Sequence, residues 1–163
     1  MASRHRSRER ALQMIFQWDQ SRAPAESIMA GYWGSLSKDE DSVAPEPDRF
    51  ANELLLGVVK DIDAIDALIT KHAQNWRIER MSSVDRSILR LGICEMMRQP
   101  SLAPVVIDEA IEIGRRYSED SGPFLNGILD AVRRSLEGAA PEPASAAVST
   151  TEQPPTQSPS DQS

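Results

Sequence analysis

Four arginines stand at alternate positions near the start of the chain, at Arg4, Arg6, Arg8 and Arg10, and Glu9 is the only acidic residue among the first ten. Four arginines against one glutamate leave a local charge of +3. Guanidinium groups bind phosphate oxygens through paired hydrogen bonds, so this cluster is a candidate nucleic-acid contact. Basic residues near a terminus also serve simply to solubilise a chain, and charge alone favours that second interpretation.

A second candidate site lies at residues 119–124, where Glu119 and Asp120 lead through a Ser-Gly-Pro turn into Phe124. An exposed ring at such a turn can stack on an unpaired base, whereas a buried ring simply packs one helix against another. The residues by themselves favour packing, and both interpretations stay open.

Signatures of catalysis are missing from the sequence. The eight glycines stand singly, so no phosphate-binding glycine loop is present, and no G-x-S-x-G motif marks a nucleophilic serine. Two histidines and one cysteine offer no spacing typical of a zinc site or a catalytic pair. Three nearby acids lack the glycine and later glutamate of a calcium loop: Asp61, Asp63 and Asp66. We therefore expect a non-catalytic protein without metal or cofactor.

Composition limits the remaining possibilities. The chain has 163 residues, of which 40% are hydrophobic, enough for one modest core, and its formal charge of −7 argues against a surface that is basic throughout. A single cysteine, Cys94, fits a reducing compartment, and no apolar run predicts a membrane span or signal peptide. We expect a soluble, cytoplasmic protein with a folded part at residues 1–138 and a disordered Pro/Ala/Ser-rich tail at residues 139–163.

Apolar residues recur at helical spacing, and no stretch alternates long enough to predict a strand, so the expected fold is all-α. The 83–98 helix should be central and mostly buried, with Arg86 and Arg90 on its narrow polar side and Ser82 as its N-cap. Gly57 is as compatible with a break in the 47–73 stretch as with one long helix. The spacing predicts helices over about residues 7–18, from residue 24 to an acidic loop at 37–49, and over 47–73, 83–98, 105–117 and 123–136.

Three segments carry a recognisable order of motifs: RHRSRERALQMIFQWDQS at residues 4–21, RMSSVDRSILRLGICEM at residues 80–96, and VVIDEAIEIGRRYSEDSGPFLNGILD at residues 105–130. In order and spacing they resemble the bacterial NusB family of antitermination factors over essentially residues 4–136. The resemblance implies an all-helical fold of about six to seven helices in two helical subdomains packed side by side. The tail lies outside it.

The resemblance also implies a function. NusB-like proteins pair with NusE, a small-subunit ribosomal protein, and the pair binds single-stranded boxA RNA of ribosomal RNA operons, which helps load an RNA polymerase complex that resists termination. A protein-only adaptor and a homodimer on the NusE-facing surface are the alternatives. NusB-like domains also precede RNA cytosine methyltransferase domains, but no catalytic domain follows residue 138 here, so an enzyme is not expected.

Site residues implied by the resemblance fall into two groups. The RNA-binding group consists of Arg4, Arg6, Arg8, Arg90, Asp120 and Phe124. The group facing NusE consists of Phe16, Arg80 and Asp85, although Phe16 is equally compatible with a place in the core. One departure from the family pattern is Gly122-Pro123 before the ring, where family members usually carry a basic residue, so one phosphate contact is expected to be absent.

Overall fold

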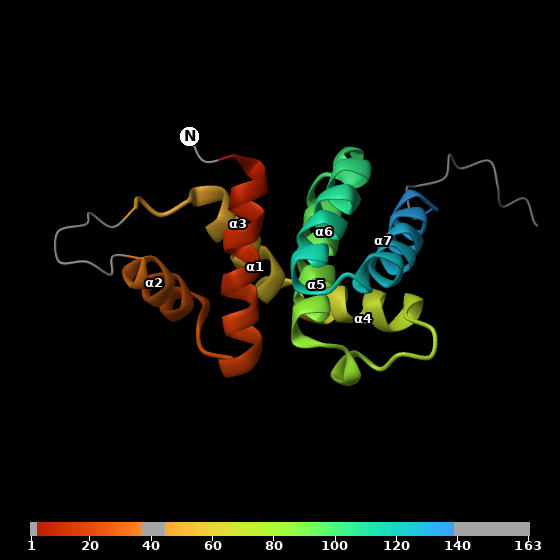
Figure 1. The fold of residues 1–163 in the computed structure, drawn as a ribbon, viewed down its shortest axis with the longest axis horizontal. Helices are drawn as coiled ribbons and strands as arrows, with labels where there is room; N and C mark the ends of the chain where they lie inside the picture. The colour runs from red at the N-terminus through yellow and green to blue at the C-terminus, as the bar shows by residue number, and fades with distance from the viewer. Residues whose placement is uncertain (1–2, 37–44, 139–163) are drawn as a thin grey trace, which may run out of the picture.

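The computed structural model describes residues 3–36 and 45–138, and all regular structure within these ranges is helical (Figure 1). The all-α prediction is confirmed. The α-helices are α1 (Arg4–Ser21), α2 (Ala25–Ser35), α3 (Arg49–Lys60), α4 (Ile62–His72), α5 (Ser83–Arg98), α6 (Ala103–Tyr117) and α7 (Ser121–Gly138), and the short 3-10 turns are η1 (Ile78–Arg80) and η2 (Pro100–Leu102).

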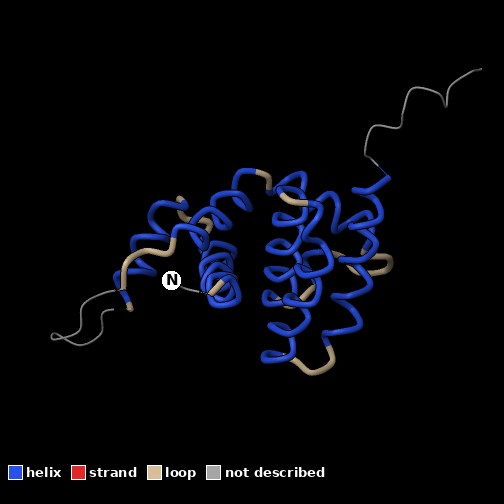
Figure 2. Tube along the Cα trace, turned by 90° about the horizontal axis from the view of Figure 1, so that it is seen from above, coloured by secondary structure: helices blue, strands red, loops and turns tan. Residues whose placement is uncertain are grey.

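The helices form two groups that lie side by side, α1–α3 in one and α4–α7 in the other (Figures 1 and 2). Helix α5 joins the groups because it packs on α1 and α3 as well as on α4, α6 and α7. Its apolar residues point in most directions and are almost wholly buried, among them Ile88, Leu89, Ile93 and Met96. The predicted central helix and the two-part arrangement are both observed.

Close packing of α5 against α3 explains why a glycine stands at position 57. A side-chain carbon at this position would lie 2.8 Å from Cys94 Sγ, so a larger residue would push the two helices apart. The break within the predicted 47–73 stretch falls at Asp61 and not at Gly57, which continues the helix. Burial raises the pKa of the Cys94 thiol to about 11, which makes it an inert core side chain.

Side-chain caps set the first residues of α1 and α5, the two helices that carry the predicted RNA-binding arginines. Ser82 accepts a hydrogen bond from the backbone N–H of Asp85 at 3.1 Å, so the predicted N-cap of α5 is confirmed. Ser3 caps α1 in the same way through Arg6, and α1 therefore begins before residue 7, where the apolar spacing predicted its start. The arginine cluster consequently lies within the helix, where alternate residues point to opposite sides.

None of the helices in residues 3–36 and 45–138 is long and apolar enough to cross a membrane. Two predictions fall outside the described residues: the disordered tail at 139–163, and residues 37–44 of the acidic loop.

Candidate nucleic-acid interface

Arg4 and Arg6 are exposed at the first turns of α1. The Arg4 guanidinium lies 3.8 Å from the centre of the Phe50 ring, which holds it without neutralising its charge. Neither arginine forms an ion pair with any residue that the structure describes. Both guanidinium groups are therefore available to an anionic ligand.

Arg8 differs from both, because it is only 6% exposed. Its Nε donates to Glu95 Oε2 at 2.9 Å and its Nη2 donates to Glu95 Oε1 at 2.5 Å. These hydrogen bonds from α1 to α5 are the main reason why the pKa of Arg8 is raised. The direct RNA contact expected of Arg8 does not fit this placement, because the guanidinium is committed to a buried carboxylate.

Arg90 is likewise buried, with 2% exposure, on the polar side of α5. Its Nη1 donates to Asp19 Oδ1 at 2.7 Å, and its Nε and Nη2 donate to Asp66 at 2.9 Å each. Burial by itself would raise the pKa of Asp19, but hydrogen bonds from Arg86 and Arg90 outweigh it and the pKa is lowered. Arg90 thus ties α5 to α1 and α4, and its expected contact with RNA is also at odds with its burial.

The turn before α7 presents an aromatic pair. The half-buried Phe124 ring meets the Trp76 ring edge-on, with centroids 5.6 Å apart, and Asp120 is exposed on the same turn. Trp76 is 56% exposed, the largest exposed fraction of any large apolar residue in the part of the chain that the structure describes. Trp76 was not among the predicted site residues, although a tryptophan next to Arg77 in a polar connection outside every predicted helix indicates an exposed ring.

The residues expected to face a partner are split between two places. Phe16 is 38% exposed, so it is not a core residue. Phe16 lines a groove of about 340 Å³ together with Val84 and the exposed Tyr117. The half-buried Asp85 directly follows Val84 in the chain. Arg80 instead borders the cavity beside Trp76. Tyr117, which was not predicted, enlarges the apolar part of this surface.

His5 lies on α1, faces α6 and is the centre of a charged cluster. Its Nδ1 is 2.5 Å from Glu109 Oε2 and its Nε2 is 3.2 Å from Glu9 Oε1, and the hydrogen bond with Glu109 is the main cause of its raised pKa. The ligand atoms of His5, Glu109 and Glu112 lie close enough together to hold a metal ion. Arg8 lies 3.9 Å from Glu109, and Arg116 pairs with the neighbouring Glu9, so cations of the protein already offset part of the negative charge around His5.

Comparisons with known proteins agree with this architecture. A model of the NusB family matches residues 5–134. A transcription antitermination protein NusB from Solibacter usitatus is 49% identical over 144 residues, which cover 88% of this chain and 94% of that protein. The corresponding protein from Sorangium cellulosum is 41% identical over 138 residues, with coverage of 83% and 95%.

Solved structures of NusB proteins also resemble this chain. The chain is similar to T. maritima NusB, with 34% identity, a TM-score of 0.66, and coverage of 82% of this chain and 92% of the other. A crystal structure of the antitermination factors NusB and NusE in complex with dsRNA contains a chain that is 25% identical, with a TM-score of 0.66 and coverage of 82% and 99%. The chain belongs to the NusB family, whose members are non-enzymatic transcription antitermination factors.

Proposed function

We propose that this protein binds single-stranded boxA RNA of ribosomal RNA operons together with NusE, and that it acts in the cytoplasm within an RNA polymerase antitermination complex. The observation that carries the proposal is the pair Arg4 and Arg6, which are exposed without an ion-pair partner among the described residues. The similar chain in complex with NusE and dsRNA supports it.

Direct contacts with RNA are assigned to the accessible members of the predicted set. Arg4 and Arg6 bind phosphates, Asp120 accepts hydrogen bonds from base or ribose groups, and the Phe124 ring stacks on a base, with Trp76 extending the stacking surface. Gly122-Pro123 adds no charge beside the ring, so RNA binding depends more strongly on the partner.

Arg8 and Arg90 act indirectly in this proposal. The ion pair of Arg8 with Glu95 fixes α1 on α5, and the ion pairs of Arg90 with Asp19 and Asp66 fix α1 and α4 on the same helix. Both are positioning residues, because Arg8 fixes the start of α1 and Arg90 fixes the end of α1, at Asp19, relative to the rest of the molecule.

NusE is proposed to dock on the groove that contains Phe16, Val84 and Tyr117, with Asp85 directly after Val84 in the chain. Arg80, which borders the separate cavity beside Trp76, is proposed to contact NusE outside this groove. Exposed apolar side chains beside a carboxylate suit a protein partner that brings a basic residue. A second copy of the chain could use the same groove, which would make homodimerisation and NusE binding mutually exclusive.

The test is a fluorescence-anisotropy titration of a labelled boxA RNA at several salt concentrations, with and without NusE, and with a scrambled RNA as the control. We expect tighter binding to boxA RNA when NusE is present and a steep loss of affinity with salt, because phosphate contacts release counterions. Absence of RNA binding while NusE is demonstrably bound would contradict the proposal and favour a protein-only adaptor.

A further inference from the structure

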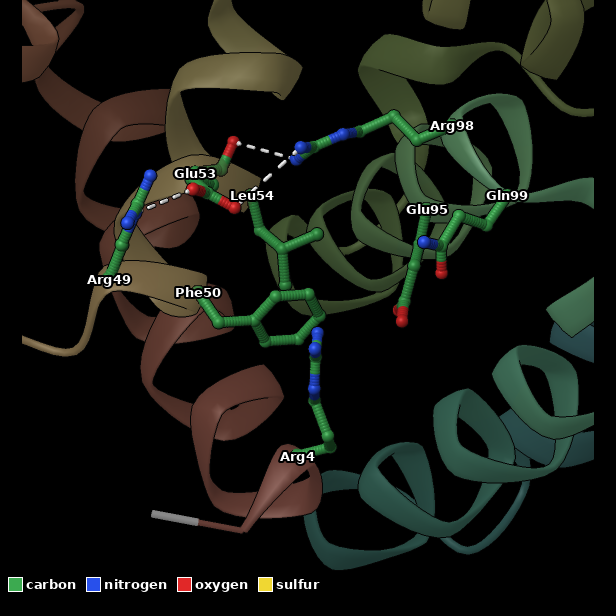
Figure 3. Close-up of a pocket in the computed structure, with 8 residues that line it drawn as sticks. All are labelled: Arg4, Arg49, Phe50, Glu53, Leu54, Glu95, Arg98 and Gln99. Carbon is green, nitrogen blue, oxygen red and sulfur yellow. Dashed lines mark hydrogen bonds and ion pairs between the residues drawn. The ribbon is translucent and has the colours of Figure 1, made fainter. Parts of the chain in front are cut away.

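A further cavity opens where α1, α3 and α5 meet, beside the first turn of α1 (Figure 3). Its volume is about 390 Å³, within the usual range for small-molecule pockets. Phe50 and Leu54 form its apolar part, and the remaining lining is charged or polar: Arg4, Arg49, Glu53, Glu95, Arg98 and Gln99.

The charge in and behind this cavity is positive, in contrast to the acidic chain as a whole. Glu95 is neutralised by Arg8, which lies behind it. Glu53 has two cationic neighbours, Arg49 at 3.1 Å and Arg98 at 3.7 Å. Four arginines, with Arg8 included, against two glutamates leave a charge of +2. The cavity therefore favours an anion.

Several hydrogen-bond donors in the cavity are unused. Arg4 makes only its contact with the Phe50 ring, and the side-chain amide of Gln99 has no hydrogen-bond partner among the described residues. Arg98 reaches Glu53 only at long range, 3.4 Å to the carbonyl oxygen and 3.7 Å to the carboxylate, and it is half-exposed. A phosphate could recruit Arg98 without breaking a short bond. Figure 3 shows Arg4 reaching the cavity from α1 and Gln99 reaching it from the end of α5.

We propose that this cavity binds one nucleotide of the single-stranded RNA, with Arg4 and Arg98 on a phosphate, Gln99 on the ribose or base, and Phe50 with Leu54 beneath the apolar face. This inference rests on the proposed RNA-binding function, because Arg4 belongs both to the exposed arginine pair and to the cavity. The cavity would extend the RNA path from α1 onto α3 and the end of α5.

Arg98→Gln and Gln99→Glu test the proposal. Arg134→Gln on α7 is the matched control because Arg134 is exposed and, among the described residues, pairs only with Asp130, at 2.9 Å. The measurement is anisotropy of boxA RNA with NusE bound. Loss of one phosphate contact by Arg98→Gln should weaken binding about threefold to tenfold and lower the slope of log affinity against log salt by about 0.7. Gln99→Glu should weaken binding at least as much, because it places a negative charge beside the phosphate.

The results distinguish failure of the cavity proposal from failure of the proposed RNA-binding function. Normal RNA binding with an unchanged salt slope in Arg98→Gln and Gln99→Glu would overturn the cavity proposal alone. No RNA binding by the unaltered chain with NusE bound would overturn both proposals. Uridine monophosphate serves as a competitor: displacement of RNA supports the assignment, whereas binding of this nucleotide without competition would show a free-nucleotide site and overturn it.

Discussion

Arg4 and Arg8 are one helical turn apart on nearly the same face of α1, yet their environments differ completely. Arg4 is exposed and rests on the Phe50 ring, while Arg8 is buried and its Nε and Nη2 donate hydrogen bonds to Glu95. The partner of Arg8 stands 87 positions away in the sequence. A distant carboxylate therefore decides which arginine of a cluster is free for a ligand and which one stabilises the fold.

Helix α5 repeats the contrast. Arg90 lies in the middle of the helix, is buried and is paired with Asp19 and Asp66, whereas Arg98 lies in the last turn and reaches Glu53 only loosely. In both helices the arginine nearer the helix end is the accessible one. The first turn of α1 and the last turn of α5 thus supply the proposed ligand contacts, whereas Arg8 and Arg90, further inside the two helices, supply ion pairs that hold the helices together.

The largest expected effect on stability comes from removal of Arg8, the buried arginine of α1. Arg8→Ala leaves the carboxylate of Glu95 buried without its partner, and we expect a loss of about 3–5 kcal/mol in the free energy of unfolding. Arg6→Ala, two residues earlier and exposed, is the control and should change stability by less than about 0.5 kcal/mol. Urea denaturation measures both. Equal losses would show that burial does not separate the two arginines.

Features with local causes were predictable from the sequence. The start of α5 was placed correctly because Ser82 and the backbone N–H of Asp85 are neighbours in the chain. The start of α1 was placed late because its apolar stripe begins after the Ser3 cap that nucleates the helix. Gly57 was a plausible break by propensity, but only the packed structure shows that it accommodates Cys94.

Features with distant causes were not predictable. The cluster of arginines predicted a charged surface, but the burial of Arg8 and Arg90 depends on carboxylates supplied by other helices. The edge-on contact of Trp76 with Phe124 joins the connection before α5 to the start of α7, so no single stretch of sequence contains it. The cavity beside Phe50 arises in the same way, from three helices.

A smaller effect is expected at the aromatic pair, which offers an RNA contact without charge. Phe124→Ala should weaken RNA binding by about 1–3 kcal/mol, the usual effect of losing one base stack. Phe124→Leu keeps apolar bulk for packing but removes the ring, and it should show a similar loss if stacking is the cause. Val105→Ala, an exposed apolar position on α6, is the control. Anisotropy with NusE bound measures all three, and unchanged binding by folded Phe124 variants would refute the stacking role.

The smallest expected effect concerns His5, which stands between Arg4 and Arg6 but faces α6 and its acids. The hydrogen bond with Glu109 raises the pKa of His5 above its ordinary value of 6.5. A raised pKa in the folded state means that the stabilisation is complete below the unfolded pKa and is lost as the pH rises through the folded pKa.

His5→Gln should therefore destabilise the protein more at about pH 6 than at about pH 9, by a difference below about 1 kcal/mol because the side chain is partly solvent-screened. Urea denaturation of both proteins at the two pH values isolates this difference, since all other titrating groups are shared. Equal destabilisation at both values would mean that the contact is an uncharged hydrogen bond. His5 would then anchor α1 to α6 through a neutral hydrogen bond, whereas Arg8 anchors it to α5 through an ion pair.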